Sequence, residues 1–425
     1  MQHVVENSNA SYVVCTKSNL SNARNLLLDK KIKKLFVIDE DSSCEEYLSI
    51  PQLMQQRPKS NQSEFVKRFE SIEPNDLIQI CFSSGTTGNP KAVSRTNLNI
   101  VQVLAICYPG FELVSEHDVF GIYSSFCHTS GITMLVISLC NGAKAVPMSC
   151  ETESYFFDYL KNHSVTVTFM VPATVNALNK LSASKGTFSS LKKVLVAGEA
   201  LSEDVAREFI RIYKPEYFGQ SYGSSEMGFP TMKPIADGLN NLKSNGVPVH
   251  GQQVKISDFE SNESLPPHKI GEIRLKGSQL TNGYINNPKA NETSFDNEGF
   301  FKSGDAGHLD EFGNLYFAYR FKEIIKYDGY PVAPAELEFI LMEHEAVKEA
   351  AVIGIQDEEG YGELPKAFVV LKEGFADIVS EKALIDYVSS QVSYYKQLRG
   401  GVVFVPKLKR TTIGKIDRRA LKNLK

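Results

Sequence analysis

Short runs of apolar and β-branched residues recur through the first half of the chain, separated by stretches with helical spacing. The runs occupy residues 34–39, 77–82, 118–123, 143–148, 165–170 and 193–198. Because they are continuously apolar, they are typical of strands buried on both faces. The stretches at 172–183 and 202–213 open at Pro172 and Ser202, which are common helix-start residues. This alternation predicts a largely parallel sheet covered by helices.

The pattern changes near residue 245 to strands joined by tight turns, and changes again beyond residue 320. The later part carries a helix opening at Pro334, apolar runs at 350–355 and 367–372, and a helical stretch near 380–396. We therefore predict an α/β fold with a large N-terminal domain of βαβ layers over residues 1–320, of which about 245–320 form a small β-rich subdomain. Residues 321–425 form a small α+β C-terminal lid domain, and the junction is a candidate hinge.

Length and composition are those of a globular protein with more than one domain. The chain has 425 residues, of which 42% are hydrophobic and 23% charged. Its formal net charge of -4 gives little long-range attraction to nucleic acid or to an anionic membrane. We therefore expect no nucleic-acid partner.

Cysteine usage and the two ends of the sequence bear on the compartment. All seven cysteines lie in the first 150 residues without a Cys-x-x-Cys pair, as is usual for reduced thiols inside a cell. The sequence shows no secretory signal, and no apolar run reaches the ~20 residues of a membrane-spanning helix. Its last three residues are not a Ser-Lys-Leu peroxisomal address. We expect a cytoplasmic protein, or a peroxisomal one despite that ending, with no membrane span.

The most distinctive polar segment is Ser83-Ser84-Gly85-Thr86-Thr87-Gly88-Asn89-Pro90-Lys91, which follows the apolar run at 77–82. Two glycines allow a tight turn that exposes amide groups, the hydroxyls add donors, and the lysine adds charge, so the segment suits a polyphosphate. It lacks the Gly-Lys-Ser/Thr ending of a Walker A loop. A polar surface turn is the alternative. We expect the loop to lie between a strand and a helix capped near Thr96 and Asn97.

The loop resembles the signature of the AMP-binding superfamily, which includes acyl-CoA synthetases, 4-coumarate–CoA ligases and beetle luciferases. Four further segments resemble the family's motifs in the family's order: residues 220–226, 303–305, 319–326 and 413–418. The resemblance thus covers nearly the whole chain. Family members carry a considerably longer segment before the loop, so we expect early strands such as 34–39 to expose edges and apolar faces.

The resemblance implies how ATP would be held. The phosphates would lie against Ser83, Ser84, Gly85, Thr86, Thr87, Gly88 and Lys91. Adenine would stack on Tyr222, with Gly223 beside it, while Ser225 would meet phosphate and Glu226 would hold Mg²⁺. Asp305 and Arg320 would bind the ribose. Alone, each acidic residue is more often a solvated surface group.

It also implies residues for the acyl group and for the two half-reactions. Lys415 would supply the positive charge for adenylation, and Lys326 would lie on the face used in the thioester step. His128 would border the acyl site, although a buried structural histidine is the alternative. Gly198 would lie in the turn under the adenine and acyl group.

The implied activity is that of an ATP-dependent acid–CoA ligase. A carboxylic acid and ATP would give an acyl-adenylate and pyrophosphate, and coenzyme A would then accept the acyl group. Two alternatives remain: a catalytically weak nucleotide-binding homologue, because Tyr319 stands where the family has an acid before the hinge arginine, and a luciferase-like monooxygenase. Neither the acid nor the oligomeric state follows from the sequence.

Overall fold

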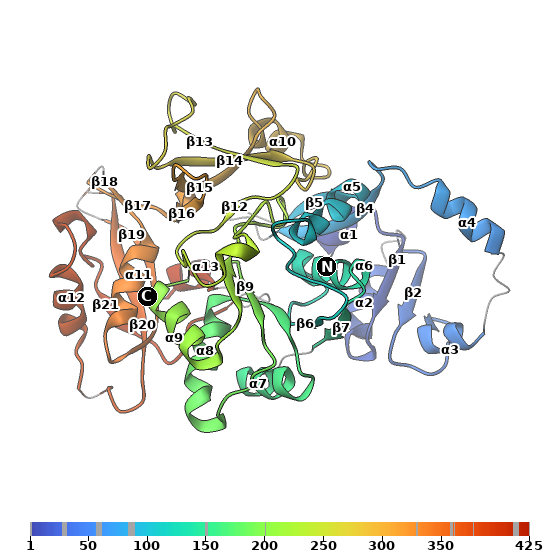
Figure 1. The fold of residues 1–425 in the computed structure, drawn as a ribbon, viewed down its shortest axis with the longest axis horizontal. Coiled ribbons are helices and arrows are strands. Elements are labelled where there is room, and N and C mark those ends of the chain that lie inside the picture. The colour runs from blue at the N-terminus through green and yellow to red at the C-terminus, as the bar shows by residue number, and fades with distance from the viewer. Residues whose placement is uncertain are drawn as a thin grey trace.

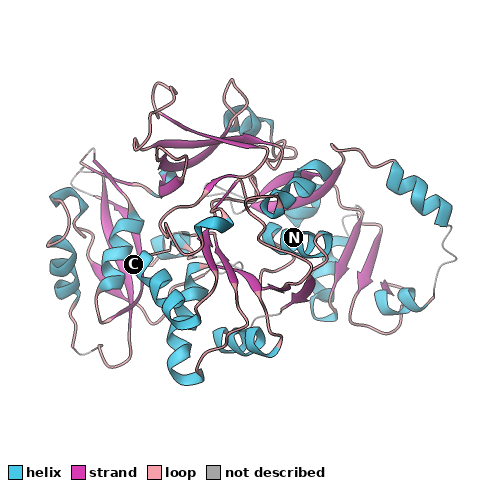
Figure 2. Cartoon of the chain, in the orientation of Figure 1, coloured by secondary structure: helices cyan, strands magenta, loops and turns pink. Residues whose placement is uncertain are grey.

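A computed structural model describes residues 2–27, 32–56, 62–83, 90–148, 152–199, 201–328, 330–357, 360, 362–376, 378–410 and 416–424. Figure 1 shows the N-terminal elements at one end of the molecule and the C-terminal elements at the other. A β-rich part lies above the middle. Figure 2 shows the strands gathered in separate sheets with helices beside them.

The centre is a parallel sheet in the order β10-β9-β8-β6-β7, so the predicted α/β fold is confirmed. Its strands are β6 (Val119–Ile122), β7 (Lys144–Pro147), β8 (Val167–Met170), β9 (Lys193–Val196) and β10 (Tyr217–Gln220). The helices around it are α6 (Thr129–Cys140), α7 (Glu153–Asn162), α8 (Pro172–Lys185) and α9 (Glu203–Tyr213). On β9, Val194 belongs to one hydrophobic cluster and Leu195 to another. Both faces of this sheet are therefore buried, as continuous apolar runs predict.

A second parallel sheet, in the order β1-β2-β3, lies at the N-terminal end. Its elements are α1 (Gln2–Ser8), β1 (Tyr12–Cys15), η1 (Lys17–Asn19), α2 (Leu20–Leu27), β2 (Lys34–Val37), β3 (Tyr47–Ser49), α3 (Ile50–Gln55) and α4 (Gln62–Glu70). The expectation that residues 34–39 expose an edge is wrong, because β2 is the middle strand and its Leu35 and Val37 are fully buried. Ile38, directly after β2, is an exposed apolar side chain, at 49%. The exposed apolar edge lies on β1, where Tyr12 and Val14 are 58% and 61% exposed.

The strand before the glycine-rich loop differs from the prediction in two ways. β4 (Leu77–Ser83) pairs antiparallel with β5 (Lys91–Thr96) instead of joining the parallel sheet, and its first two residues are half exposed. The strand β5 lies between the loop and the predicted helix. The helix α5 (Asn97–Val101) comes one element later and is capped by Thr96 as predicted, followed by η2 (Gln102–Cys107). Residues 91–96 form a strand because they pair with β4 along their whole length, and Tyr284 from a distant segment adds a bridge to Val93.

Four antiparallel strands in chain order form the β-rich part: β13 (Gln252–Ser257), β14 (Gly271–Gly277), β15 (Phe301–Leu309) and β16 (Leu315–Arg320). The short elements before and within it are β11 (Thr231–Met232), η3 (Ile235–Asp237), β12 (Val247–Pro248) and α10 (Pro288–Ser294). One face packs around Ile273 and Leu275, and Tyr222 joins that cluster. This face therefore connects the β-rich part to the end of the central sheet.

The C-terminal region has its own three-stranded sheet and core. Its elements are η4 (Phe321–Glu323), β17 (Ile325–Tyr327), β18 (Tyr330–Val332), α11 (Pro334–Glu343), β19 (Val347–Gln356), β20 (Glu363–Leu371), α12 (Glu381–Ser389), η5 (Tyr394–Lys396), β21 (Val402–Phe404) and α13 (Arg418–Lys422). The helix predicted near 380–396 is too long, since α12 ends at Ser389 and only a 3-10 turn comes after it. None of the helices in the described ranges has the length and apolar character needed to cross a membrane.

Candidate active site

Asp305, which is buried, and Arg320, which is partly exposed, form an ion pair where β15 and β16 run side by side. The two residues are register partners in the ladder. Arg320 donates its Nε to Oδ1 of Asp305 at 2.6 Å and an Nη to Oδ2 at 3.2 Å. Burial by itself lowers the pKa of Arg320, but the charge of Asp305 outweighs this and raises it. Asp305 is only 1% exposed, so this guanidinium is the main countercharge of its carboxylate.

Tyr222, two residues after β10, reaches the same carboxylate. Its hydroxyl donates to Oδ2 of Asp305 at 2.7 Å, and one face of its ring stacks on Phe317 with the centroids 6.2 Å apart. Burial, followed by the charge of Asp305, raises the pKa of Tyr222 well above its ordinary value. The phenol therefore stays protonated and acts as a donor. The structure thus brings together Tyr222, Asp305 and Arg320, three residues that the sequence placed around a nucleoside.

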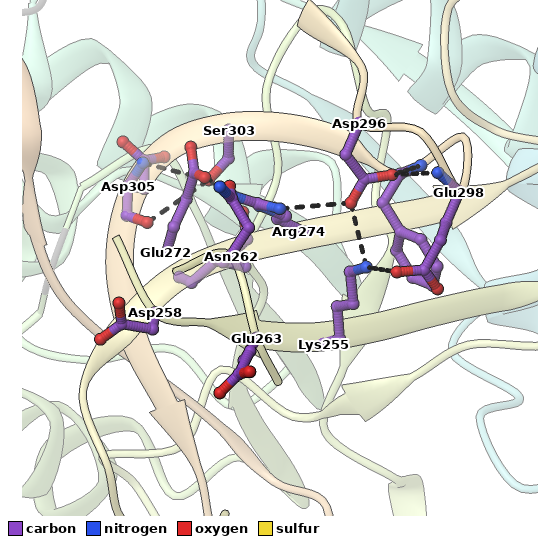
Figure 3. Close-up of polar contacts among 12 residues, drawn as sticks. Lys255, Asp258, Asn262, Glu263, Glu272, Arg274, Asp296, Glu298, Ser303 and Asp305 are labelled. Atoms are coloured by element: carbon purple, nitrogen blue, oxygen red, sulfur yellow. Dashed lines mark hydrogen bonds and ion pairs between the residues drawn. The ribbon is translucent and has the colours of Figure 1, made fainter. Parts of the chain in front are cut away.

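A network of charged side chains lies beside β15, the strand that carries Asp305 (Figure 3). Arg274 is 2% exposed and donates to Glu272 at 2.8 Å and to Asp296 at 3.3 Å, and Lys255 lies 2.9 Å from the same Asp296. In the adjacent strand the Ser303 hydroxyl donates to the carbonyl of Ile273 at 2.5 Å. The sequence analysis missed this network because its members are scattered through ordinary turns and strands. It fixes the backbone from which Asp305 projects.

Glu226 forms a second cluster. Its Oε2 accepts a hydrogen bond from the Ser224 hydroxyl at 2.9 Å and its Oε1 accepts one from the Tyr284 hydroxyl at 3.1 Å. Lys91 places its Nζ 4.6 Å from the centre of the Tyr284 ring, which is cation–π distance. Tyr284 was missed by the sequence analysis, and it connects Glu226 to the end of the glycine-rich loop.

The base of that loop is closed by pairing. Ser83 and Lys91 are register partners in the β4–β5 ladder, so the two ends of the loop lie side by side. Ser84, Gly85, Thr86, Thr87 and Gly88 lie outside the described residues, as does Lys415. Their proposed contacts with ATP therefore stay predictions.

The turn after β10 closes tightly on itself. A Cβ built on Gly223 would collide with the carbonyl oxygen of Gly228. The Ser225 carbonyl accepts a hydrogen bond at 3.3 Å from Arg95, whose side chain is fully buried. Burial lowers the pKa of Arg95 to about 10. Gly223 is therefore needed for the shape of the turn that presents Tyr222 and Glu226.

His128 is the N-cap of α6. Its Nδ1 accepts the backbone N–H of Ser130 at 3.2 Å and lies 2.6 Å from the hydroxyl of the same residue. A structural role is thus present, and the role at an acyl site stays a prediction. Gly198 follows β9 with φ +98°, which favours glycine.

The C-terminal region contacts the turn that follows Arg320. Arg418 donates to Glu338 and lies 3.4 Å from Glu323 of the hinge turn. Burial lowers the pKa of Arg418, but the charges of Glu338, Glu323 and Glu199 raise it, and Glu199 follows β9 of the central sheet. Lys326 is exposed on β17. Within the described contacts, neither Lys326 nor Gly198 is joined to the Asp305 or Glu226 clusters.

The residues around Glu226 fit a magnesium ion that is bound together with a phosphate ligand. Both of its hydrogen-bond donors are neutral hydroxyls, so they orient the carboxylate without cancelling its charge. The described residues contain no cluster of three or more histidine, cysteine or acidic side chains for a metal. Mg²⁺ commonly uses one or two carboxylates and completes its shell with water and substrate phosphate.

A parallel sheet buried on both faces, a polar cluster around Asp305 after its last strand and a C-terminal region with its own core are consistent with the class of adenylate-forming enzymes. Family models for the AMP-binding enzyme and for the AMP-binding enzyme C-terminal domain match residues 1–285 and 336–415. The chain belongs to this AMP-binding, adenylate-forming superfamily, as its motifs indicated.

Three relatives illustrate the similarity. A luciferin 4-monooxygenase from Nipponoluciola cruciata is 32% identical over 398 residues, which cover 92% of this chain and 72% of the relative. 4-Coumarate–CoA ligase 1 from Oryza sativa subsp. japonica is 33% identical over 366 residues, which cover 83% of this chain and 63% of the ligase. An o-succinylbenzoate CoA synthetase from Bacillus subtilis, solved with its acyl-adenylate intermediate, superposes with a TM-score of 0.78 at 26% identity, covering 97% and 83% of the two chains. This chain therefore spans less than two thirds of the rice ligase.

Proposed function

We propose that this protein is an ATP-dependent acid–CoA ligase. In the first half-reaction a carboxylate oxygen of the acid attacks the α-phosphorus of ATP, the bond to the β-phosphate oxygen breaks, and pyrophosphate leaves. In the second, the thiol of coenzyme A attacks the acyl carbon of the adenylate. AMP leaves, the thiol proton is released, and a thioester remains.

One observation carries the proposal most strongly. Tyr222, Asp305 and Arg320 come from separate elements and meet at one buried carboxylate. A carboxylate oxygen can accept two hydrogen bonds, and Oδ1 of Asp305 accepts one from Arg320, so a sugar hydroxyl would be its second donor. Relatives and similar structures include CoA ligases and an acyl-adenylate complex, which supports ATP use by this chain.

The side chains contribute mainly orientation and charge. The attacking carboxylate is already ionised at neutral pH, so no general base is needed, and negative charge builds on phosphate oxygens. Positive charge and donors fixed in advance at those oxygens lower the barrier. Lys91 lies where the loop ends, and Glu226 is oriented to hold Mg²⁺, which when bound would neutralise phosphate charge.

The C-terminal region supplies the remaining proposed residues. Lys415 provides the charge that adenylation needs, and Lys326 lies on the face that serves thioester formation. Arg320 ends β16 directly before the hinge turn, so the ribose contact and the hinge share a residue. This arrangement supports the proposed domain division at residue 320.

The test is a pyrophosphate-release assay with a panel of medium-chain, long-chain and aryl acids, beside Lys415→Ala. We expect acid-dependent pyrophosphate release, thioester formation when coenzyme A is added, and a large loss of the first step in the variant. Lys326→Ala should instead slow thioester formation from preformed adenylate. ATP binding by calorimetry with no turnover for any acid, unchanged by Lys415→Ala, would favour a nucleotide-binding homologue without ligase activity.

Similarity to a luciferin 4-monooxygenase supports one second candidate, oxygenation of the adenylate. The two candidates share the adenylation step and differ in the second half-reaction. Light emission and oxygen uptake with a luciferin, in place of thioester formation, would favour the oxygenase.

A further inference from the structure

The hydroxyl of Tyr284 lies against the carboxylate proposed to hold the metal. Tyr284 is 8% exposed and donates to Oε1 of Glu226 at 3.1 Å, while Ser224 donates to Oε2 at 2.9 Å. Each oxygen therefore has one neutral donor and keeps a lone pair. A lysine or arginine in the place of Tyr284 would compete with a cation for this carboxylate, whereas a phenol does not.

Tyr284 is itself held firmly at its backbone. Its N–H donates to the side-chain oxygen of Asn291 at 2.7 Å, and its carbonyl accepts from the side-chain amide of the same residue at 2.9 Å. It also bridges to Val93 on β5, and the next residue donates to Ala92 at 2.9 Å. The phenol is thus anchored on secondary structure before it reaches Glu226.

Other buried tyrosines use their hydroxyls differently. Tyr159, Tyr213 and Tyr217 donate to backbone carbonyls, at 2.9, 2.8 and 2.7 Å. Tyr284, like Tyr222, donates instead to a carboxylate of the candidate site. A buried hydroxyl needs one acceptor, and a backbone carbonyl would satisfy it as well as a carboxylate does.

We propose that Tyr284 is a positioning residue that fixes the orientation of Glu226 for a divalent cation bound with a nucleoside triphosphate, and couples that carboxylate to Lys91. The proposal rests on the proposed function. Outer partners of a ligating carboxylate affect metal affinity because they remove the rotations that binding would otherwise have to freeze. The ring of Tyr284 meanwhile faces the Lys91 ammonium, so one side chain contacts both the metal-binding acid and the end of the phosphate loop.

The experiment is Tyr284→Phe, which removes the hydroxyl and keeps the ring under Lys91. ATP binding is measured by calorimetry in EDTA and across a Mg²⁺ series, and Mn²⁺ binding to the ATP complex is measured by electron paramagnetic resonance. We expect the metal affinity to fall roughly 10- to 100-fold while ATP affinity in EDTA stays at the parental value. Ser224→Ala, which removes the other donor, should shift the metal affinity in the same direction.

Tyr213→Phe is the matched control, since it removes a buried hydroxyl that donates to the backbone carbonyl of Leu178. It should leave the Mg²⁺ series unchanged. Parental metal affinity in Tyr284→Phe, with ATP still bound, would overturn this inference and leave the proposed function standing, whatever Ser224→Ala does. A parent protein that binds no ATP with or without Mg²⁺ would overturn both.

Discussion

Arg320 is both the cross-strand neighbour and the ion-pair partner of Asp305, with its Nε 2.6 Å from the carboxylate. Arg320 also precedes the hinge turn as its N-cap residue. The carboxylate proposed to bind ribose is therefore bonded directly to the first residue of the junction between the two parts of the chain. Any rotation at this candidate hinge would begin beside the ion pair.

Replacing Arg320 with methionine should strongly destabilise the protein. Asp305 is 1% exposed in the parent protein, and the variant would leave its carboxylate with the Tyr222 hydroxyl as a neutral donor and no countercharge. Breaking a buried ion pair from one side costs about 3 kcal/mol or more, and partial exposure of Arg320 puts the expectation at that lower end. Urea unfolding measures the change. Arg207→Met breaks a surface pair with Glu203 and should cost less than about 1 kcal/mol. Equal losses in the two variants would contradict the prediction.

Gly223→Ala should distort the turn that carries Tyr222 and Glu226. Its Cβ would collide with the backbone oxygen of Gly228, which cannot shift without moving the turn. Overpacking of this kind costs roughly 1–3 kcal/mol, and ATP binding by calorimetry should weaken together with stability. Gly121→Ala is the comparison, because its Cβ would meet side-chain atoms and no backbone: the two Val165 methyls at 3.0 and 3.3 Å and the Thr168 hydroxyl at 3.6 Å. Normal ATP affinity in Gly223→Ala would show that the turn is not needed for binding.

His128→Ala should lower the free energy of unfolding by about 1 kcal/mol, the usual effect of removing an N-cap. The imidazole accepts the backbone N–H of Ser130 at the start of α6, and alanine offers no acceptor. His128→Asn restores a capping side chain and should regain most of the loss. Denaturant titration of the three proteins checks this. Identical midpoints for the alanine variant and the parent would rule out a capping role.

Lys233 should make stability depend on pH above neutrality. Its side chain is fully buried, it donates to the carbonyl of Asn240 at 2.7 Å, and burial lowers its pKa from 10.5 to about 8. Between those values the unfolded chain binds more protons than the folded chain, so stability due to this group rises with pH. Relative to Lys233→Met, the parent should gain up to roughly 3 kcal/mol from pH 8 to 10.5. Unfolding curves collected across that range give the difference, and parallel pH profiles would contradict it.

The central sheet was predictable because its strands carry their own signal. Residues 118–123, 165–170 and 193–198 are continuously apolar, and strands with that pattern are buried on both faces. Residues 77–82 have the same local pattern, yet β4 leaves Leu77 and Ile78 half exposed. The local sequence pattern indicates how apolar a strand is. It does not indicate which strands it pairs with or which side chains cover it.

The candidate site was predicted through motifs, and its supporting side chains were not. Asp305, Arg320 and Tyr222 lie in segments that resemble family motifs, and the structure brings them together. Tyr284 and Arg274 lie in segments with no such resemblance, and their partners are far away in sequence or separated by turns. Contacts of that kind are decided by tertiary packing, which a single sequence does not display.

The pairing of β5 with the segment around Tyr284 has a consequence for the order of folding. Ser94 bonds to Gly283 across a separation of 189 residues, and the central sheet lies between them in the chain. Closing so long a loop is entropically unfavourable until the intervening part is compact, so contacts of this range tend to form late. A newly synthesised chain should therefore acquire its hydrophobic interior first, and reach competence for nucleotide only in a final step.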